Sequence, residues 1–412
     1  MSFQQGLSGL NASSKALDVI SNNVANSNTV GFKQSEAHFS DVYAASLSRT
    51  GDNQVGIGTM VSSISQVFTQ GNVTVTDNPL DVAINGNGFF RMSQNGTISY
   101  TRNGQFDVDK NGYIVNDQGL RLTGYPADSS GTILSASPTD LTVDTSDLTP
   151  TATSTASVGL NLDSRESAPS NSPFSMTDPK SYTSSTALTV YDSLGNAHTS
   201  TMYFVKSATA GQWDMYTSLD GGAVGAATSL TFSSSGALSA VSQGGVAVPN
   251  DAIPQSVTVS TGAVSPLDFT MDFSKTTQFG SSFGVNLMSQ NGFSAGRLSG
   301  LNIDEDGIVQ ARYSNGQSRN LGQVALANFT APNGLVSLGN NQWAESSESG
   351  PPLVGKPGTS SLGVLQSSAV EESNVDLTEQ LVDMITMQRA YQANAQSIKT
   401  EDQIMQTLVN LR

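Results

Sequence analysis

The chain has no cysteine among its 412 residues, so it has no disulfide, no thiolate nucleophile and no cysteine-based zinc or iron site. Charged residues make up only 13% of the sequence, well below the roughly 25% of typical globular domains. The two histidines, His38 and His198, lie too far apart in sequence to indicate a histidine metal site. We therefore expect no metal and no cofactor.

The chain also has few basic residues: 18 lysines and arginines stand against 34 acidic residues, giving a net charge of −16. Such a charge repels phosphate backbones and anionic lipid, so we expect no nucleic-acid partner. No apolar stretch is long enough to span a bilayer, which predicts no membrane insertion. Polar residues also interrupt every hydrophobic run near the amino terminus, so the sequence predicts no ordinary cleaved signal peptide.

Catalytic motifs fail on inspection. Residues 280–284 match the G-x-S-x-G pattern of a nucleophile elbow, but a histidine should follow the serine in that fold, and both histidines precede Ser282. His198 is expected on a strand beside a turn. Carboxylate pairs such as Glu371 and Glu372 are common on solvated faces, so they carry little weight as a catalytic pair. These patterns predict that the protein is not an enzyme.

One stretch resembles a calcium-binding loop. Asp107, Asp109, Asn111 and Gly112 have the required offsets, but the twelfth position is Gln118, where a bidentate glutamate is needed. No helix pattern flanks the loop. The sequence therefore predicts a hairpin turn here and no calcium site.

Helical periodicity is confined to the two ends of the chain. Ser2 with Gln5 and Asp376 with Glu379 form potential amino-terminal caps. The apolar residues of the first segment recur at four- and three-residue steps, namely Phe3, Leu7, Leu10, Leu17 and Val24. Those of the second are Leu377, Leu381, Met384, Tyr391, Ala395, Ile398, Met405 and Val409. Each narrow stripe needs a partner helix, supplied by the same chain or by another copy; spacing alone leaves both open.

An asparagine-rich break follows the first helix, in the sequence NNVANSNTVGFK at 22–33. Asparagine side chains bond to nearby backbone, and Gly31 tolerates a left-handed conformation. We expect Asn23 and Asn26 to form the turn with Gly31, and Phe32 to anchor it by burial beside Lys33. The break would separate the helix from a strap, including residues 46–58, that leads toward a β region.

The long middle of the chain has β patterning. Leu267, Phe269 and Met271 alternate with polar residues, and eight Asn-Gly dipeptides suit type I′ hairpins. No Asn-Gly lies between residues 113 and 290, which indicates an inserted region without this turn chemistry. Small polar residues at 149–157 and 277–286 suggest linkers at its boundaries.

These motifs together resemble the bacterial flagellar hook proteins of the axial rod and hook family. The amino-terminal 33 residues and the segment 373–412 are similar to the terminal signatures of that family. Internal phrases such as LDVAINGNGFF, YTRNGQFDVDKNGYIV and VYDSLGNAH are similar to the hook type. The resemblance covers nearly the whole chain and is weakest around 207–262.

The resemblance implies a mainly β, nested multi-domain protein with terminal α-helices. Its expected parts are a helical polymerisation domain with connecting strap (1–71 and 366–412), a discontinuous β domain (72–151 and 285–365) and an inserted outer β domain (152–284). It also implies a homopolymeric hollow tube whose inner helices carry the two apolar stripes.

The family further implies a universal joint that transmits motor torque from rod to filament, outside the cell. Implied partners are distal rod, hook cap and hook-filament junction proteins, and the flagellar type III export apparatus. Two alternatives remain open: a distal-rod type axial protein, and a secreted β-rich adhesin. The inserted region argues against the first alternative.

Overall fold

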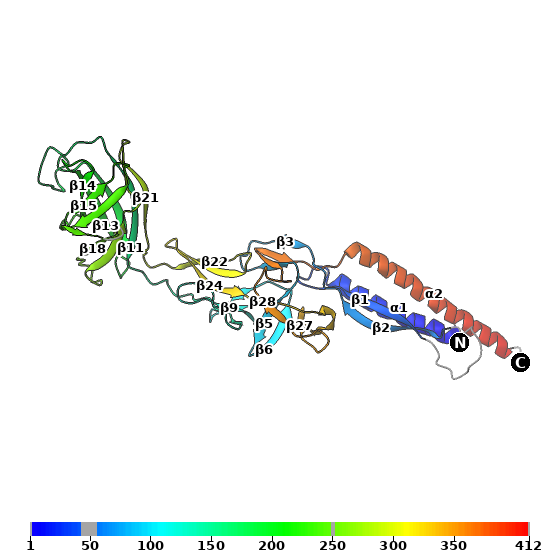
Figure 1. Ribbon diagram of the computed structural model, residues 1–412. Coiled ribbons are helices and arrows are strands. Elements are labelled where there is room, and N and C mark those ends of the chain that lie inside the picture. The colour runs from blue at the N-terminus through cyan, green and yellow to red at the C-terminus, as the bar shows by residue number, and fades with distance from the viewer. Residues whose placement is uncertain (1, 43–55, 249–251, 411–412) are drawn as a thin grey trace. The chain divides into compact units, whose positions relative to one another are not determined.

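The computed structural model describes residues 2–42, 56–248 and 252–410. The chain divides into two compact units, unit 1 and unit 2. Unit 1 consists of Met1–Thr145, Gly300–Arg312 and Ser318–Arg412, and unit 2 of Ser146–Ser299 and Tyr313–Gln317. Strands predominate, with one helix near each end of the chain, which confirms the predicted fold class (Figure 1).

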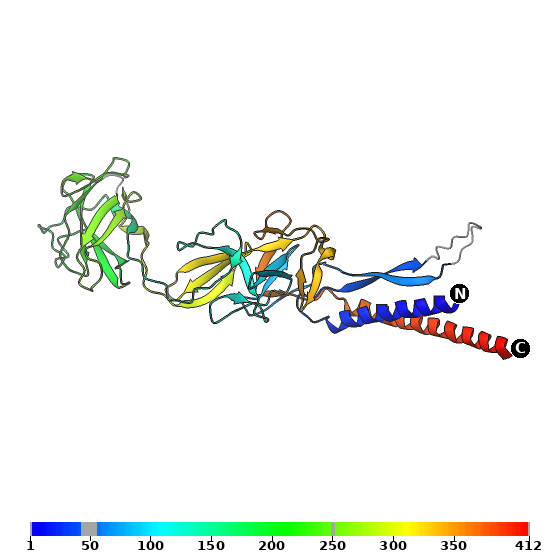
Figure 2. The same ribbon diagram turned by 90° about the horizontal axis from the view of Figure 1, so that it is seen from below.

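The two terminal helices lie side by side and antiparallel in both ribbon views (Figures 1 and 2). They are α1 (Ser2–Ala25) and α2 (Leu377–Asn410). As predicted, Asp376 caps α2: its carboxylate accepts bonds from the backbone nitrogens of Thr378 and Glu379, at 2.8 and 3.1 Å. A ribbon of β1 (Ser35–Val42) and β2 (Gly58–Gln66) packs along α1. Residues 46–55 of the predicted strap lie outside the described residues.

Unit 1 also contains a large, mostly antiparallel sheet built from two distant parts of the sequence. Among the described residues its main strand order is β22-β23-β24-β9-β5-β6-β27-β26. These strands are β5 (Phe89–Gln94), β6 (Thr97–Thr101), β9 (Arg121–Pro126), β22 (Leu298–Ile303), β23 (Ile308–Tyr313), β24 (Ser318–Val324), β26 (Val336–Gly339) and β27 (Gln342–Ala344). Attached to it are β7 (Asp107–Val108), β8 (Ile114–Val115), β10 (Thr139–Asp140), β25 (Leu326–Asn328) and β28 (Leu353–Gly355).

Two further strand pairs join the ends of the chain within unit 1. They pair β3 (Val73–Val75) with β30 (Ala369–Glu371), and β4 (Val82–Asn85) with β29 (Val364–Ser367). Both pairs are antiparallel, and β30 directly precedes α2. The carboxy-terminal helix is therefore connected to the β region through a strand that pairs with the amino-terminal half.

The predicted hairpins form, although their turn chemistry differs from the expectation. Of the eight Asn-Gly dipeptides, only Asn95-Gly96 has positive φ at both residues, 51° and 90°. Other turns with two positive φ values use Asp220-Gly221, Gly244-Gly245 and Asn340-Asn341. At the calcium-like stretch, Asp109 accepts bonds from two backbone nitrogens of its own β7–β8 turn, as expected of a hairpin.

Unit 2 is a β-sandwich of two sheets whose apolar faces share one core. One sheet contains β11 (Thr155–Asp163), β18 (Ala252–Val257), β19 (Leu267–Asp272), β20 (Thr277–Phe279) and β21 (Gly284–Gln290). The other runs in order through β12 (Ser184–Tyr191), β13 (Ala197–Lys206), β14 (Gln212–Leu219), β15 (Thr228–Phe232), β16 (Leu238–Gln243) and β17 (Val246–Ala247). Trp213, Phe204 and Met271 are fully buried in this core.

The two predicted linkers are partly strand. Residues 155–157 open β11, while 277–279 and 284–286 belong to β20 and β21. These small polar residues pair within a sheet, so a composition typical of linkers does not exclude strand pairing. Unit 2, from Ser146 to Ser299, is accordingly wider than the predicted span 152–284.

Candidate self-assembly interface

The two helices contact each other through small residues of α1. A Cβ at Gly6 would lie 3.0 Å from Ile398, and a Cβ at Gly9 would lie 2.8 Å from the Asn394 side chain. Glycine therefore permits this close approach. Farther along α1 the buried side chains are Ala12, Ser13, Ala16, Ile20 and Asn23.

The predicted apolar stripe of α1 lies beside this contact face. Phe3 and Leu7 are exposed, and Leu10, Leu17 and Val24 are half-buried. The chain thus pairs its helices through small and polar side chains, and its larger apolar residues remain at least partly free.

The predicted stripe of α2 is divided in the same way. Half-buried positions are Met384, Ala395 and Ile398. Exposed positions are Leu377, Leu381, Tyr391, Met405 and Val409, ranging from 37% for Tyr391 to 70% for Val409. Sequence periodicity missed three more exposed apolar side chains, Val382, Ile385 and Ile404. Such a concentration of exposed apolar side chains is typical of an interaction surface.

The break after α1 is held by asparagine side chains. The Asn26 side-chain amide donates to the Asn22 carbonyl and to the Asn22 side-chain oxygen, at 3.0 and 2.7 Å. Buried Asn23 donates to the carbonyl of Ser35 and accepts from its backbone nitrogen, at 2.8 and 2.9 Å. It also donates to Gln380 of α2 at 3.0 Å. One amide therefore ties α1, β1 and α2 together.

Gly31 lies where the chain passes close to the large sheet. Its φ is 70°, and a Cβ there would lie 2.5 Å from the backbone nitrogen of Asn103. Its own nitrogen donates to the Glu371 carbonyl at 2.8 Å. Only glycine fits this left-handed conformation and close approach together.

A buried ionic cluster lies beside this turn, and sequence analysis did not foresee it. The Lys33 ammonium donates to Glu371 and to the Thr69 carbonyl, both at 2.6 Å, and Arg102 donates to Glu371 at 3.0 Å. The side chains of Lys33 and Glu371 are 0% exposed. Glu371 therefore does not lie on a solvated face, where such carboxylate pairs are common, and Lys33, rather than the half-buried Phe32, is the fully buried anchor.

Charge balance in this cluster depends on the single carboxylate. Burial lowers the pKa of Lys33, and the charge and hydrogen bond of Glu371 oppose that shift. Burial also lowers the pKa of Arg102, again against Glu371. The cluster joins the segment after α1, the large sheet and the strand before α2, so it fixes where both helices leave the β region.

A second polar cluster lies in unit 2. His198 occupies a strand beside a turn, as predicted, and its two ring nitrogens contact Asp220 at 2.6 Å and Asp192 at 3.2 Å. Asp192 also accepts from Thr261 at 2.6 Å. Burial lowers the pKa of His198, but the bonds with both carboxylates outweigh it and raise the pKa overall.

The part of the chain that the structure describes lacks a metal-binding cluster and a membrane-spanning helix. There, no group of three or more histidine, aspartate or glutamate side chains is arranged to hold a metal ion. Across the same residues, no helix combines the length and apolarity that crossing a membrane would require.

Four segments match protein-family descriptions. Residues 3–33 match the flagella basal body rod protein, and residues 83–159 match the flagellar hook protein FlgE/F/G D1 domain. Residues 161–293 match the flagellar basal body protein FlaE D2 domain, and residues 366–411 match the flagellar basal body rod FlgEFG protein C-terminal.

The similarity to known proteins covers the whole chain. The flagellar hook protein FlgE of Salmonella typhimurium is 44% identical over 420 residues, covering 100% of both chains. That of Borreliella burgdorferi is 34% identical over 453 residues, covering 100% of this chain and 99% of the relative. The crystal structure of Helicobacter pylori flagellar hook protein FlgE2, 14% identical, has a TM-score of 0.52 over 72% of this chain and 100% of that one, a likeness in fold. The chain belongs to the flagellar hook protein family.

Proposed function

We propose that this chain is the structural subunit that self-assembles into a hollow, curved flagellar hook and transmits torque from rod to filament. Full-length similarity to hook proteins supports this function. The observation that carries the assembly mechanism is the apolar surface left free when α1 and α2 pair within one chain.

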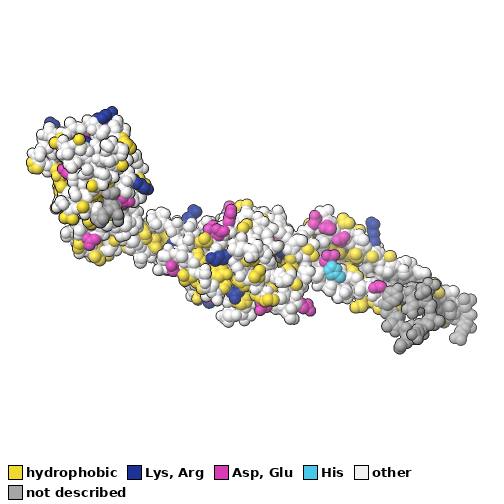
Figure 3. Space-filling model, in the orientation of Figure 1, with side chains coloured by type: hydrophobic (Ala, Val, Ile, Leu, Met, Phe, Trp, Pro, Cys, Tyr) yellow, Lys and Arg dark blue, Asp and Glu magenta, His cyan; other side chains and the backbone are white. Residues whose placement is uncertain are grey.

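Assembly requires a contact that does not close on itself. When the exposed residues of one helix pair bury against a different face of the next, the contact repeats and generates an open helical polymer. Apolar burial would then supply the cohesion. On the face drawn in Figure 3, charged side chains are sparse, and contacts between uncharged side chains can be exchanged as the tube bends.

The layers follow from this mechanism. The terminal segments 1–71 and 366–412 would form the inner polymerisation layer, and the β domain of 72–151 and 285–365 the middle shell. We widen the proposed outer domain from 152–284 to Ser146–Ser299, the main range of unit 2, and this leaves 72–145 and 300–365 for the middle shell.

Further features of the proposal come from the family alone. They are a non-catalytic role, export by the flagellar type III apparatus to the cell exterior, and contact with distal rod, hook cap and hook-filament junction proteins.

The experiment introduces a charge on the exposed helical residues. Leu7→Asp and Leu381→Asp should abolish tube formation in negative-stain images and sedimentation, because a buried aspartate would lose its hydration. Both residues are exposed in the single chain, so its fold should persist. Ile398 also belongs to the predicted stripe of α2, but it is a poorer probe because it packs on Gly6 of the same chain.

The control is Val246→Asp, which makes the same chemical change on an exposed residue of unit 2. It should polymerise like the parent protein. Normal tubes from both helix variants would place the assembly determinant elsewhere.

A further inference from the structure

We propose that the open edge of β26 and the pocket beside it form a docking site for an extended, uncharged segment of a second copy of this chain. The inference rests on the proposed function, because it requires a polymer in which copies meet. It concerns the β sheet of unit 1 and not the helices.

Strand β26 ends the main strand order of the large sheet. It pairs with β27, and its other edge is open in the described part of unit 1. All four of its residues are exposed, including the large apolar side chains of Val336 at 53% and Leu338 at 56%. An open edge presents unpaired backbone donors and acceptors to which another strand can bond.

The edge is also unusually free of charge. No charged residue occurs between Arg319 and Glu345, although charged side chains commonly protect open edges from pairing. A register shift between Ser337 and Gly339 interrupts the pairing with β27 in the half of the strand next to the turn. Because each copy carries a net charge of −16, two copies approach with least repulsion where their surfaces are neutral. Neutrality therefore favours a second copy over a basic partner.

The hairpin is held rigidly before any partner arrives. Trp343 of β27 is buried, its ring lies 5.5 Å from Phe68 and 5.7 Å from Phe89, and its indole donates to Gln66 at 2.5 Å. Leu335, just before β26, packs against the same cluster. A docking strand would therefore meet a preorganised edge and lose little free energy to ordering it.

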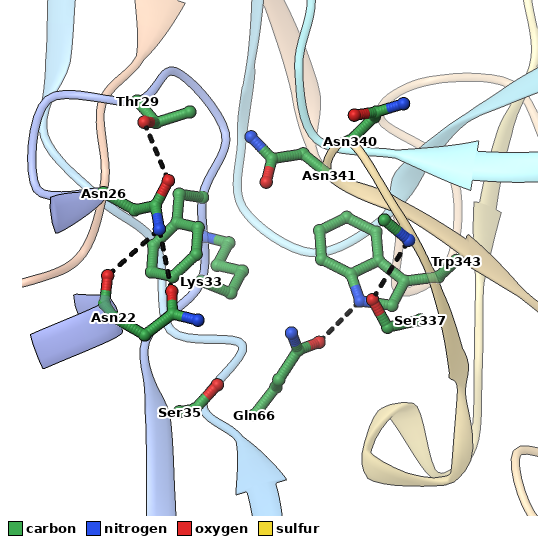
Figure 4. Close-up of a pocket in the computed structure, with 12 residues that line it drawn as sticks. Asn22, Asn26, Thr29, Lys33, Ser35, Gln66, Ser337, Asn340, Asn341 and Trp343 are labelled. Atoms are coloured by element: carbon green, nitrogen blue, oxygen red, sulfur yellow. Dashed lines mark hydrogen bonds between the residues drawn. The ribbon is translucent and has the colours of Figure 1, made fainter. Parts of the chain in front are cut away.

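A pocket of about 400 Å³ lies on one face of this hairpin. Asn22 approaches it from the end of α1 and Asn26 from the turn that follows, and Asn340 and Asn341 approach from the opposite side, as Figure 4 shows. Lys33 lines the pocket, but its ammonium is bonded to Glu371 and the Thr69 carbonyl. The pocket therefore presents uncharged amides, which suit an uncharged polar side chain.

Strand geometry connects the edge with the pocket. Ser337 and Gly339 line the pocket. Val336 precedes the register shift, and side chains alternate between faces along a strand, so Val336 lies on the face opposite to Ser337. A segment added along β26 would place side chains of one face against Val336 and side chains of the other face into the pocket. Main-chain hydrogen bonds along the edge would then supply affinity, and side-chain contacts on the two faces would supply specificity.

The first test adds lysines to the edge. Val336→Lys with Leu338→Lys should leave the Trp343 fluorescence and melting temperature of the unpolymerised chain unchanged and prevent tube growth. The matched control Leu134→Lys changes another exposed apolar residue of unit 1 and should polymerise normally. In wild-type tubes, the amides of 336–339 should exchange hydrogen at least about tenfold more slowly than in the single chain.

The second test identifies the occupant. Because the chain has no cysteine, Leu338→Cys provides a single thiol for a maleimide photo-crosslinker. In tubes grown from mixed ¹⁴N- and ¹⁵N-labelled copies, cross-linked peptide pairs should combine both isotopes; pairs of one isotope only would mean a contact within one chain and overturn the proposal.

The remaining outcomes separate the two proposals. Wild-type tubes whose 336–339 amides exchange as in the single chain would overturn this inference and leave the proposed function standing. Normal tubes from the double-lysine variant would do the same. Failure of the wild-type chain to form tubes at all would overturn both.

Discussion

Glu371→Gln removes the only anion from the buried cluster and leaves Lys33 and Arg102 as two buried cations. From their distances to Glu371, 2.6 and 3.0 Å, the two cations lie no more than about 8 Å apart, which gives a repulsion of at least about 2 kcal/mol at an effective dielectric constant of ~20. Charge-assisted hydrogen bonds are lost as well. We expect the free energy of unfolding of unit 1 to fall by about 3–5 kcal/mol.

Charge balance predicts a smaller effect for the opposite change. Lys33→Met removes one cation and leaves the Glu371–Arg102 pair neutral overall. Its expected cost is about 1–3 kcal/mol, from the bonds lost at Glu371 and at the Thr69 carbonyl. Glu372→Gln is the matched control, because this neighbouring carboxylate is exposed, and it should change stability little.

The assay uses the distribution of tryptophan, since each compact unit contains one of the two tryptophans. In a Trp213→Phe background, Trp343 fluorescence follows urea unfolding of unit 1 alone, which avoids assigning one free energy to a two-unit chain. The reasoning is refuted if Lys33→Met destabilises unit 1 as much as Glu371→Gln does, or if Glu371→Gln behaves like its exposed control.

Two further predictions concern single positions. The pKa of His198 is raised in the folded protein, so its stabilisation of unit 2 should be complete below about pH 6.5 and lost as pH rises through the folded pKa. In urea unfolding followed by Trp213 fluorescence, His198→Gln should flatten this pH dependence of the free energy of unfolding. A variant whose free energy of unfolding changes with pH as in the parent protein between about pH 6 and 9 would contradict the prediction. Gly31→Ala should destabilise unit 1 more than Gly96→Ala in urea unfolding followed by Trp343 fluorescence. Both glycines have positive φ, which alone costs alanine about 1–2 kcal/mol, but a Cβ at Gly96 meets nothing within 4 Å while one at Gly31 meets Asn103 at 2.5 Å. Equal losses of stability would show that the close approach at Gly31 relaxes.

The sequence predicted those features that local chemistry determines. The ends of the helices follow from apolar spacing and from the Asp376 cap, and strand β19 follows from alternating burial at Leu267, Phe269 and Met271. Local rules were less reliable for turn type. An Asn-Gly pair adopts the type I′ conformation only where two strands meet across a two-residue loop, as at Asn95-Gly96 between β5 and β6.

The ionic cluster could not be predicted in this way. Lys33 and Glu371 are 338 residues apart, and Arg102 and Glu371 are 269 residues apart, so neither pairing leaves a periodic signal. Burial of a lysine also contradicts the general preference of that residue for the surface. The sequence also did not predict that α1 contacts α2 through small residues. The reason is related, because glycine and alanine indicate a close helix contact only when the partner helix is known.

The wide sequence separation of the β3–β30 and Lys33–Glu371 contacts sets an order in which the chain can fold. Closing such long loops costs more entropy than closing short ones, and folds rich in distant contacts form slowly. Apart from Tyr313–Gln317, unit 2 is continuous from Ser146 to Ser299, so its sandwich can form while the carboxy-terminal segment is still absent. Unit 1 cannot be completed before Glu371 is present, and a chain shortened before that residue would carry a folded unit 2 and an incomplete unit 1.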